Sequence, residues 1–179
     1  MRWVGLLFIA GSCYAQAEYR AEAYGALGRS WVGDDEGSLG SSVSMAGTAG
    51  WRFTPGFGVE LNLDWFQHRR EFTSASIEGH GLMATGDLLY HFRGRSRVQP
   101  YVLFGAGLAR YVRERSFGPG PERSGNGSIW NAATGVKVFV SDRIAIRPEW
   151  RIGMGRGFGS SFEPPLYYQR FSVGVGYRW

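Results

Sequence analysis

Apolar and polar residues alternate along most of this chain with a period of two, the pattern of a β-strand that has one apolar face. The alternation is clearest between residues 57 and 67, where valine, leucine and tryptophan take turns with glutamate, asparagine and aspartate. The pattern predicts eight strands, at 19–31, 43–53, 57–67, 81–92, 101–112, 129–140, 144–152 and 167–179. The fifth strand fits either phase, and we favour the one that turns Phe104 and Leu108 to the apolar side and Gly105 and Gly107 to the other.

The connections between these strands alternate in length. Long connections are expected at 32–42, 68–80, 113–128 and 153–166, and short ones at 54–56, 94–97 and 141–143. An up-and-down barrel with an even number of strands has this alternation of connection lengths, with short turns at one end and long loops at the other. The sequence therefore predicts an all-β fold, an eight-stranded antiparallel up-and-down barrel.

The alternation alone does not decide which side of the barrel is inside. A soluble, lipocalin-like barrel would turn its apolar side inward around a ligand, whereas a membrane barrel turns that side toward lipid. An arginine facing lipid at the bilayer centre costs about 2–4 kcal/mol, so a lipid exterior forces the charges inward. The apolar-side aromatics gather in two rings near the strand ends, as in the aromatic girdles of membrane barrels. One ring comprises Phe53, Phe57, Tyr90, Phe92 and Trp179 near the short turns, and the other comprises Trp31, Trp65 and Trp130. We therefore expect a transmembrane barrel, with the soluble periplasmic barrel as an alternative.

Residues 1–17 have the composition of a secretory signal peptide. Arg2 precedes a short apolar run, and Ala15 and Ala17 form a small-x-small cleavage site. The apolar run is shorter than the roughly 20 residues that a membrane helix needs. We expect cleavage after Ala17, which leaves one domain, the barrel, at residues 18–179.

The charge and the cysteine content exclude several kinds of site and partner. The only cysteine, Cys13, lies in the signal peptide, so neither a disulfide scaffold nor a thiolate metal site is expected after cleavage. The formal net charge of +5 would suggest nucleic acid as a partner in a cytosolic protein. An exported chain meets phosphate-bearing lipid instead, so no nucleic-acid partner is expected.

The last strand carries a further signal. At every second position it bears aromatic or β-branched residues, and the chain ends on Trp179. This resembles the terminal strand of bacterial outer-membrane β-barrel proteins, whose final aromatic is recognised by the barrel-assembly machinery. With the signal peptide and strand rhythm, the whole chain resembles the small outer-membrane barrels that include the OmpA-type membrane domain and opacity-like proteins. The resemblance implies a location in the bacterial outer membrane and assigns Phe171, Tyr177 and Trp179 to the assembly signal.

The inward side carries charges of both signs. An eight-stranded barrel has an interior just wide enough for side chains to fill. Because an unpaired buried charge is expensive, we expect these side chains to form ion pairs across the lumen. The expected network comprises Arg52, Glu60, Asp64, Asp87, Arg147, Glu149, Arg151 and Arg170, with Glu22 as a further partner. Such a network would leave no stable open pore.

Several arginines are expected near the long connections. Guanidinium groups bind phosphate through paired hydrogen bonds, and the outer leaflet presents phosphorylated glycolipid. The set comprises Arg29, Arg69, Arg70, Arg110, Arg113, Arg115, Arg123 and Arg156. From it we assign Arg69, Arg70, Arg113 and Arg115 to contact with lipid phosphate and lipopolysaccharide.

Catalytic and metal chemistry find little support. None of the three histidines begins a His-x-Ser triplet like that of lipid A deacylases, and the sequence contains no Gly-x-Ser-x-Gly motif. His68, His80 and His91 are expected to be solvated residues near strand ends rather than metal ligands. No cofactor, metal site or catalytic residue is assigned.

The sequence thus predicts a monomeric, non-enzymatic outer-membrane barrel that presents four surface loops, for envelope structure or surface interaction. A narrow porin-like channel is the first alternative, and the soluble ligand-binding barrel is the second. The composition of the loops does not identify a partner.

Overall fold

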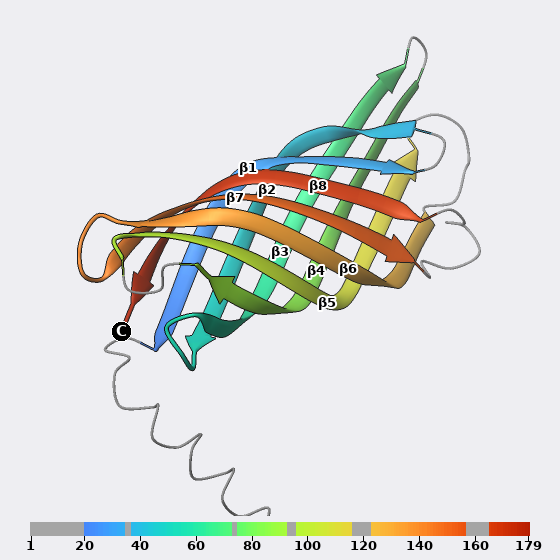
Figure 1. The fold of residues 1–179 in the computed structure, drawn as a ribbon. Helices are drawn as coiled ribbons and strands as arrows, with labels where there is room; N and C mark the ends of the chain where they lie inside the picture. The colour runs from blue at the N-terminus through green and yellow to red at the C-terminus, as the bar shows by residue number, and fades with distance from the viewer. Residues whose placement is uncertain (1–19, 35–36, 73–74, 93–95, 116–122, 157–164) are drawn as a thin grey trace, which may run out of the picture.

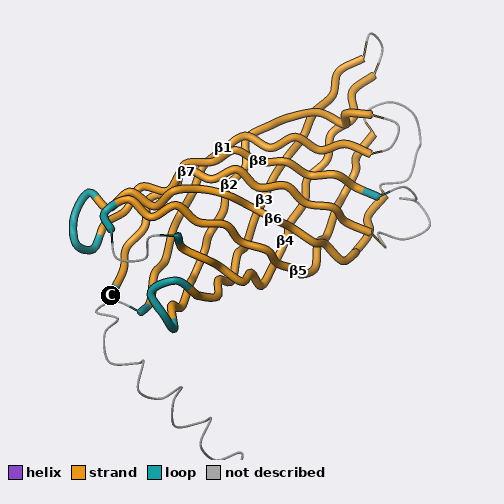
Figure 2. The backbone as a smooth tube through the Cα atoms, viewed as in Figure 1, coloured by secondary structure: helices purple, strands orange, loops and turns teal. Residues whose placement is uncertain are grey.

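The computed structural model describes residues 20–34, 37–72, 75–92, 96–115, 123–156 and 165–179. Eight strands form one closed antiparallel barrel, in which each strand pairs with the next and β1 pairs with β8 (Figure 1, Figure 2). The strands are β1 (Ala21–Asp34), β2 (Gly37–Arg52), β3 (Phe57–Phe72), β4 (Ala75–His91), β5 (Val98–Arg115), β6 (Arg123–Phe139), β7 (Ile144–Arg156) and β8 (Leu166–Arg178). The predicted eight-stranded up-and-down barrel is confirmed. Over the described ranges, helices long and apolar enough to cross a membrane are absent.

The first and last described residues close the barrel at one end. The backbone N–H groups of Arg20 and Ala21 donate to the carbonyl of Trp179, at 3.2 and 3.3 Å. The connections between β2 and β3, β4 and β5, and β6 and β7 lie at the same end, which we call the terminal end. The hairpin of β3 and β4 projects furthest from the opposite end, at the upper right of Figure 1. We call that opposite end the far end.

Seven of the eight strands are longer than the sequence pattern predicts, and β8 has the predicted length. Their lengths run from 13 residues in β7 to 18 in β5, against about 9–11 needed to cross a bilayer. At the far end β3 continues to Phe72 and β4 begins at Ala75, so the predicted connection at 68–80 is mostly a paired hairpin. The predicted connections at 32–42, 113–128 and 153–166 are shortened in the same way. Outside the bilayer neither side of a strand must be apolar, so the hydrogen-bonded ladder continues where the alternation has ended.

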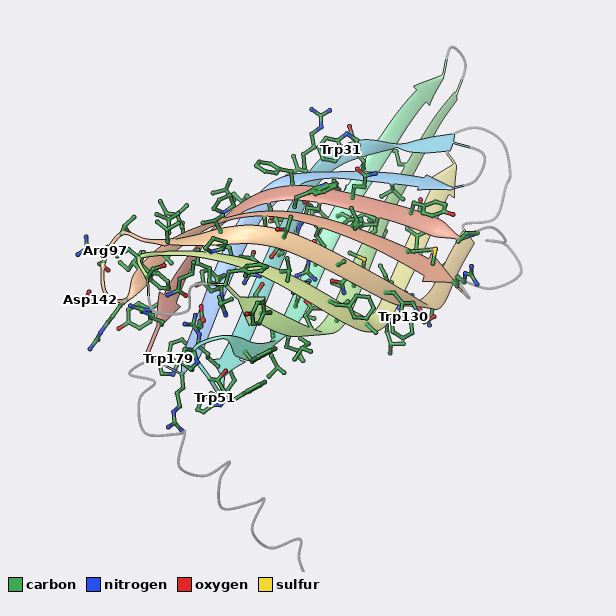
Figure 3. The ribbon with its side chains drawn as sticks, in the orientation of Figure 1. Trp31, Trp51, Arg97, Trp130, Asp142 and Trp179 are labelled. Carbon is green, nitrogen blue, oxygen red and sulfur yellow. The ribbon has the colours of Figure 1, made fainter. Side chains whose placement is uncertain are left out.

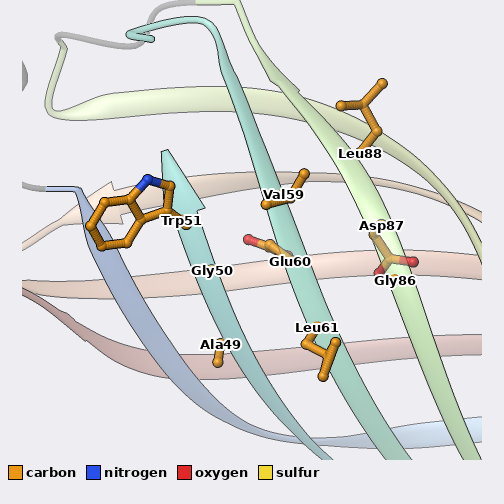
Figure 4. A pocket seen from close by; sticks show the side chains of 9 residues that line it. All are labelled: Ala49, Gly50, Trp51, Val59, Glu60, Leu61, Gly86, Asp87 and Leu88. Carbon is orange, nitrogen blue, oxygen red and sulfur yellow. The ribbon is translucent and has the colours of Figure 1, made fainter. Parts of the chain in front are cut away.

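The two sides of the sheet differ as expected. The outward side is apolar, with Leu61, Phe104 and Leu108 each more than half exposed. The favoured phase of the fifth strand is confirmed, because Phe104 and Leu108 face out and Gly105 is buried. The alternation can be followed in Figure 4, where Glu60 lies between Val59 and Leu61 on β3.

Exposed aromatic side chains occur near both ends of the outward side. Trp51 and Trp179 lie toward the terminal end, whereas Trp31 and Trp130 lie toward the far end (Figure 3). On β8 the outward Tyr167 and Tyr177 are ten residues apart, which at a strand tilt of about 40° corresponds to a height of about 25 Å. That height equals the apolar band of outer-membrane barrels.

Candidate functional site

The inward side chains of the barrel form a connected set of ion pairs, which we call the lumen network. Glu149 of β7 lies at its centre. Its carboxylate accepts hydrogen bonds from Arg147 Nη2 at 2.6 Å, Arg151 Nε at 3.0 Å and Arg170 Nη2 at 2.6 Å. The hydroxyl of Tyr101 donates to the same carboxylate at 2.7 Å. One carboxylate therefore holds three guanidinium groups that come from two neighbouring strands.

Toward the terminal end the network continues through alternating charges. Arg147 donates two parallel hydrogen bonds to Glu60, at 2.9 and 2.8 Å. Lys137 contacts Glu60 at 3.3 Å and Glu22 at 2.9 Å, and Arg52 contacts the other oxygen of Glu22 at 2.8 Å. Glu60 and Glu22 thus each lie between two cations, and the chain of contacts runs from β7 through β3 and β6 to β1 and β2.

Toward the far end the network ends in two aspartates. Arg151 Nη1 donates to Asp87 at 2.8 Å, and Arg170 forms an ion pair with Asp64. Tyr168 donates its hydroxyl proton to Asp64 at 2.6 Å. Each aspartate is thereby paired with a guanidinium group that also binds Glu149.

The charges in the lumen are balanced. Among the described residues, five buried cations face five buried carboxylates, and the exposed fraction of these residues does not exceed 6%. The cations are Arg52, Lys137, Arg147, Arg151 and Arg170, and the carboxylates are Glu22, Glu60, Asp64, Asp87 and Glu149. Side chains that line a water-filled bore would keep accessible area on their lumen side. The near-zero exposure therefore indicates that the network excludes water at its own level.

Two inward glycines make room for this filling. A Cβ on Gly105 of β5 would lie 1.9 Å from Oδ1 of Asp87, and one on Gly176 of β8 would lie 2.1 Å from the ring of Tyr24. Any larger residue would collide with the side chain that occupies the space. These glycines accommodate side chains of the lumen rather than widen a bore.

Beyond the network, toward the far end, the lumen is apolar. The ring of Phe66 packs against that of Tyr168 with centroids 5.1 Å apart. The buried cluster comprises Val32, Phe66, Met83, Ala109, Tyr111, Ile129, Leu166 and Tyr168. We call it the apolar lumen cluster. This apolar layer was not predicted from the sequence, although its residues occupy inward positions of the alternation.

The structure brings all eight residues of the predicted ion-pair set into the lumen network. Glu22 and Lys137 also belong to it, and both occupy inward positions in the sequence pattern. The hydroxyls of Tyr24, Tyr101 and Tyr168 were not predicted to join the network, because a tyrosine on a barrel strand is more readily assigned to an aromatic girdle. Tyr24 donates its hydroxyl proton to Glu22 at 2.6 Å. The inward phase of the three tyrosines is the signal that could have found them.

One histidine differs from the expectation. His91 was expected to be solvated, but it is 2% exposed, and its Nε2 lies 3.4 Å from Arg52. His91 is the last residue of β4, yet its inward phase places the ring inside the terminal end of the lumen. Its position at a strand end did not indicate exposure, because the barrel wall continues around it.

The predicted assembly signal lies on the outward side of β8 and at Trp179, the residue after it. Phe171, Tyr177 and Trp179 are 52%, 43% and 59% exposed. The rings of Tyr177 and Trp179 stack with centroids 6.2 Å apart. Tyr177 and Trp179 therefore make an aromatic surface at the terminal end that another molecule can contact, whereas Phe171 lies six residues further along β8.

The predicted phosphate-contact arginines lie on strands at the far end. Arg69 and Arg70 belong to β3, and Arg113 and Arg115 to β5. In the register, Arg70 and Arg115 both pair with Ile77 of β4, so the backbones of β3, β4 and β5 align these positions in one row. The side chains of these four arginines lie outside the described residues, as do residues 1–17 with the predicted signal peptide.

Comparison with known proteins identifies the family. The sequence profile described as "Outer membrane protein beta-barrel domain" matches residues 4–178. The chain belongs to this outer-membrane β-barrel family. None of the curated proteins matches the sequence closely enough to count as a relative.

Solved structures of other barrel proteins share the fold. Neisserial surface protein A (NspA) superposes with a TM-score of 0.70 at 15% identity, covering 89% of this chain and 97% of that one. Ail, the attachment invasion locus protein of Yersinia pestis, in complex with the heparin analogue sucrose octasulfate, gives 0.60 at 18% identity, with 89% and 99% covered. The N-terminal β-barrel domain of Pseudomonas aeruginosa OprF gives 0.55 at 18% identity, with 90% and 98% covered. At these identities the likeness shows the fold.

The family, the fold and the outward apolar surface together show that this protein is an integral β-barrel of the bacterial outer membrane. The alternative of a soluble ligand-binding barrel is wrong, because the large apolar side chains of the band face outward and the charges face inward. In such barrels the short turns lie in the periplasm and the longer connections outside the cell. By this rule we assign the far end, where the paired strands project furthest, to the outside of the cell, and the terminal end to the periplasm.

Proposed function

We propose that this protein is a closed, non-enzymatic barrel that presents its external hairpins and four surface loops, for envelope structure or surface interaction. The observation that carries the proposal is the filled lumen. The charge-balanced lumen network and the apolar lumen cluster lie one above the other, so an ion would have to cross both. Since a rigid wall with a blocked interior has no path for solute, specificity belongs to the external segments.

The conductance of the purified protein in planar bilayers tests this proposal. We expect no steady channels from the wild-type monomer. Because the apolar lumen cluster remains in place, the single substitution Arg147→Ala is also expected to leave the conductance at background. Steady, large-conductance channels from the wild-type monomer would overturn the proposal and favour the narrow porin-like channel.

A positive control shows that the assay can detect an opened lumen. The double variant Arg147→Ala/Phe66→Ala removes a large side chain from each of the two layers. It is expected to show leak currents that neither single variant shows. Migration as a folded, heat-modifiable band on a cold detergent gel checks that each variant forms a barrel before its conductance is compared.

The export and assembly of the chain belong to the same proposal. We infer a monomer whose signal peptide is removed after Ala17 and whose β8 strand presents Phe171, Tyr177 and Trp179 to the barrel-assembly machinery. N-terminal sequencing of protein isolated from outer membranes should begin at Glu18. A different first residue would contradict the inferred cleavage site.

A surface role also includes contact with lipopolysaccharide through Arg69, Arg70, Arg113 and Arg115. Their strands extend beyond the apolar band at the external end, which supports this part of the proposal. Neutralising the four arginines should lower the amount of lipopolysaccharide that co-purifies with the protein. Unchanged co-purification would contradict it. A binding screen of intact cells against host and envelope components would address the loop partner.

A further inference from the structure

Two outward arginines lie on either side of β6, just beyond the exposed aromatic side chains of the external end, such as Trp130. Arg110 of β5 pairs in register with Asn126 of β6, and Arg156 of β7 pairs with Ser128 of β6. All four side chains are exposed on the outward side. Asn126 and Ser128 thus lie between the arginines and supply an amide and a hydroxyl, which also bind phosphate oxygens.

The spacing suits convergence on one small anion. The two arginine backbones are separated by two inter-strand steps and one offset of two residues, which gives a Cα–Cα distance of about 12 Å. Long guanidinium side chains that lean toward β6 from both sides can therefore reach the same group above Asn126 and Ser128. Guanidinium groups donate paired hydrogen bonds to phosphate, and a cluster of them prefers it as a ligand.

No acidic group of the described structure competes for these arginines. Within the described ranges, Arg110 and Arg156 form no ion pair or hydrogen bond. The outward positions in the two register rows that contain them are otherwise neutral: Leu82, Ala84, Leu108, Asn126 and Ser128. The site therefore carries two positive charges that the described part of the protein does not neutralise.

An apolar hollow lies on the membrane side of the arginines, directly below Arg156 and two register rows below Arg110. It is lined by Trp130, Ala132, Ile152, Met154 and Tyr167, from β6, β7 and β8. In the register, Trp130, Met154 and Tyr167 form the row immediately below Ser128 and Arg156. The step from that row to Arg156 is about 7 Å along the strand, which takes the guanidinium from the aromatic interface into the headgroup layer.

A second outward hollow provides a comparison within the same molecule. It lies over β2, β3 and β4, where Trp51, Leu61, Gly86 and Leu88 line it (Figure 4). The charged residues of its lining, Glu60 and Asp87, are buried in the lumen network. It therefore offers an apolar surface without outward charge, and of these two hollows in the described part of the barrel, the one over β6–β8 combines the two features that a phosphorylated lipid requires.

We propose that the outward face of β5, β6 and β7 binds one phosphorylated lipid of the outer leaflet. Its phosphate lies between Arg110 and Arg156, with Asn126 and Ser128 as further donors, and an acyl chain occupies the hollow beneath. The site differs from the external arginine set assigned above, and it goes beyond the proposed function because a conducting barrel could bear it equally well. A failed conductance test would therefore leave this site unaffected.

Titration of the detergent-solubilised barrel, followed by native mass spectrometry, tests the proposal with three probes. These are bis-phosphorylated lipid A, the same lipid A after removal of its phosphates, and inorganic phosphate. We expect lipid A to bind the wild-type protein about tenfold or more tightly than the dephosphorylated lipid does, since each charge-assisted contact contributes substantially. Millimolar inorganic phosphate should not displace lipid A, because it cannot occupy the hollow.

Matched variants locate the effect. Arg110→Gln/Arg156→Gln is expected to weaken lipid A binding about tenfold or more, and Arg156→Gln alone should give part of that loss. The control Arg97→Gln/Arg143→Gln removes two positive charges at the periplasmic end and should bind lipid A as the wild type does. Ala132→Phe, which fills the hollow, should weaken lipid A binding while leaving both arginines in place. Mobility on a cold detergent gel verifies that each variant is folded.

Four results would count against the proposal. Lipid A binding that is unchanged in Arg110→Gln/Arg156→Gln removes the phosphate site. Equal affinity for lipid A and its dephosphorylated form leaves only a general apolar contact. Displacement of lipid A by inorganic phosphate alone identifies an anion site without a lipid. An Ala132→Phe variant that binds like the wild type removes the acyl-chain hollow from the proposal.

Discussion

Replacing Glu149 by glutamine tests the central contact of the lumen network. The side chain keeps its size, but the lumen is left with five cations and four carboxylates among the described residues. Three guanidinium contacts at 2.6–3.0 Å lose their charged acceptor. With an effective dielectric constant of about 20, each contact is worth about 5 kcal/mol before desolvation. Burial of the carboxylate itself costs several kcal/mol, so the net loss on removing one buried partner is about 3–5 kcal/mol.

Urea unfolding of the barrel in lipid vesicles, followed by tryptophan fluorescence, measures this loss. The matched control is Asp142→Asn, which removes the same charge from an exposed side chain in the β6–β7 turn. The control should change the free energy of unfolding by less than about 0.5 kcal/mol. The double variant Glu149→Gln/Arg147→Met restores equal numbers of charges in the lumen, leaves Glu60 paired with Lys137, and should recover part of the loss.

The reasoning fails if Glu149→Gln unfolds like the wild type while the fluorescence transition remains cooperative. That result would mean that water or a rearranged network stabilises the three guanidinium groups as well as the carboxylate does. A loss as large in Asp142→Asn would show instead that net charge, and not the buried geometry, sets the stability.

Three further outcomes are expected. Gly105→Ala should destabilise the barrel by about 1–3 kcal/mol, because its Cβ would lie 1.9 Å from Asp87 Oδ1. Gly86→Ala, whose Cβ would meet no atom within 4 Å, should stay near wild type in the same urea titration. Tyr101→Phe removes the hydroxyl that accepts from Arg147 at 2.6 Å and donates to Glu149, and should cost about 1–3 kcal/mol; equal stability would show that the carboxylate and guanidinium compensate directly. Trp179→Ser should lower the amount of folded barrel in outer membranes on a heat-modifiability gel, while the refolded protein unfolds close to wild type because Trp179 is exposed. Equal amounts of both proteins in the membrane would remove Trp179 from the assembly signal.

The sequence predicted the membrane-spanning part of the fold well because the bilayer imposes a simple rule there. Along β3, lipid requires Val59 and Leu61 to face outward, so Glu60 must face inward. At the external end the rule no longer applies. The pairing of Phe72 with Ala75 was therefore not expected, although the two strands continue to hydrogen-bond up to that point.

The residues of the lumen network were likewise predicted only in part from the sequence. Inward phase alone assigned Arg147, Glu149 and Arg151 to the lumen. The phase could not show that Arg147, Arg151 and Arg170 bind the same carboxylate, because this contact joins different strands: Arg170 belongs to β8, and Tyr101, which also binds Glu149, belongs to β5. Nor could it show the hollow below Arg156, because that surface combines side chains from three strands.

The sequence by itself determined the strand number, the order of the strands, the lipid-facing side and the sign of the charges that enter the lumen. Each of these follows from periodicity and from the cost of exposing charge to hydrocarbon, which are properties of single strands. The tertiary structure alone decided which cation meets which carboxylate, that the apolar lumen cluster lies above the network, and that Arg110 and Arg156 flank the same two residues of β6. These depend on the register between strands, and register is fixed by the closure of the whole barrel rather than by any one segment.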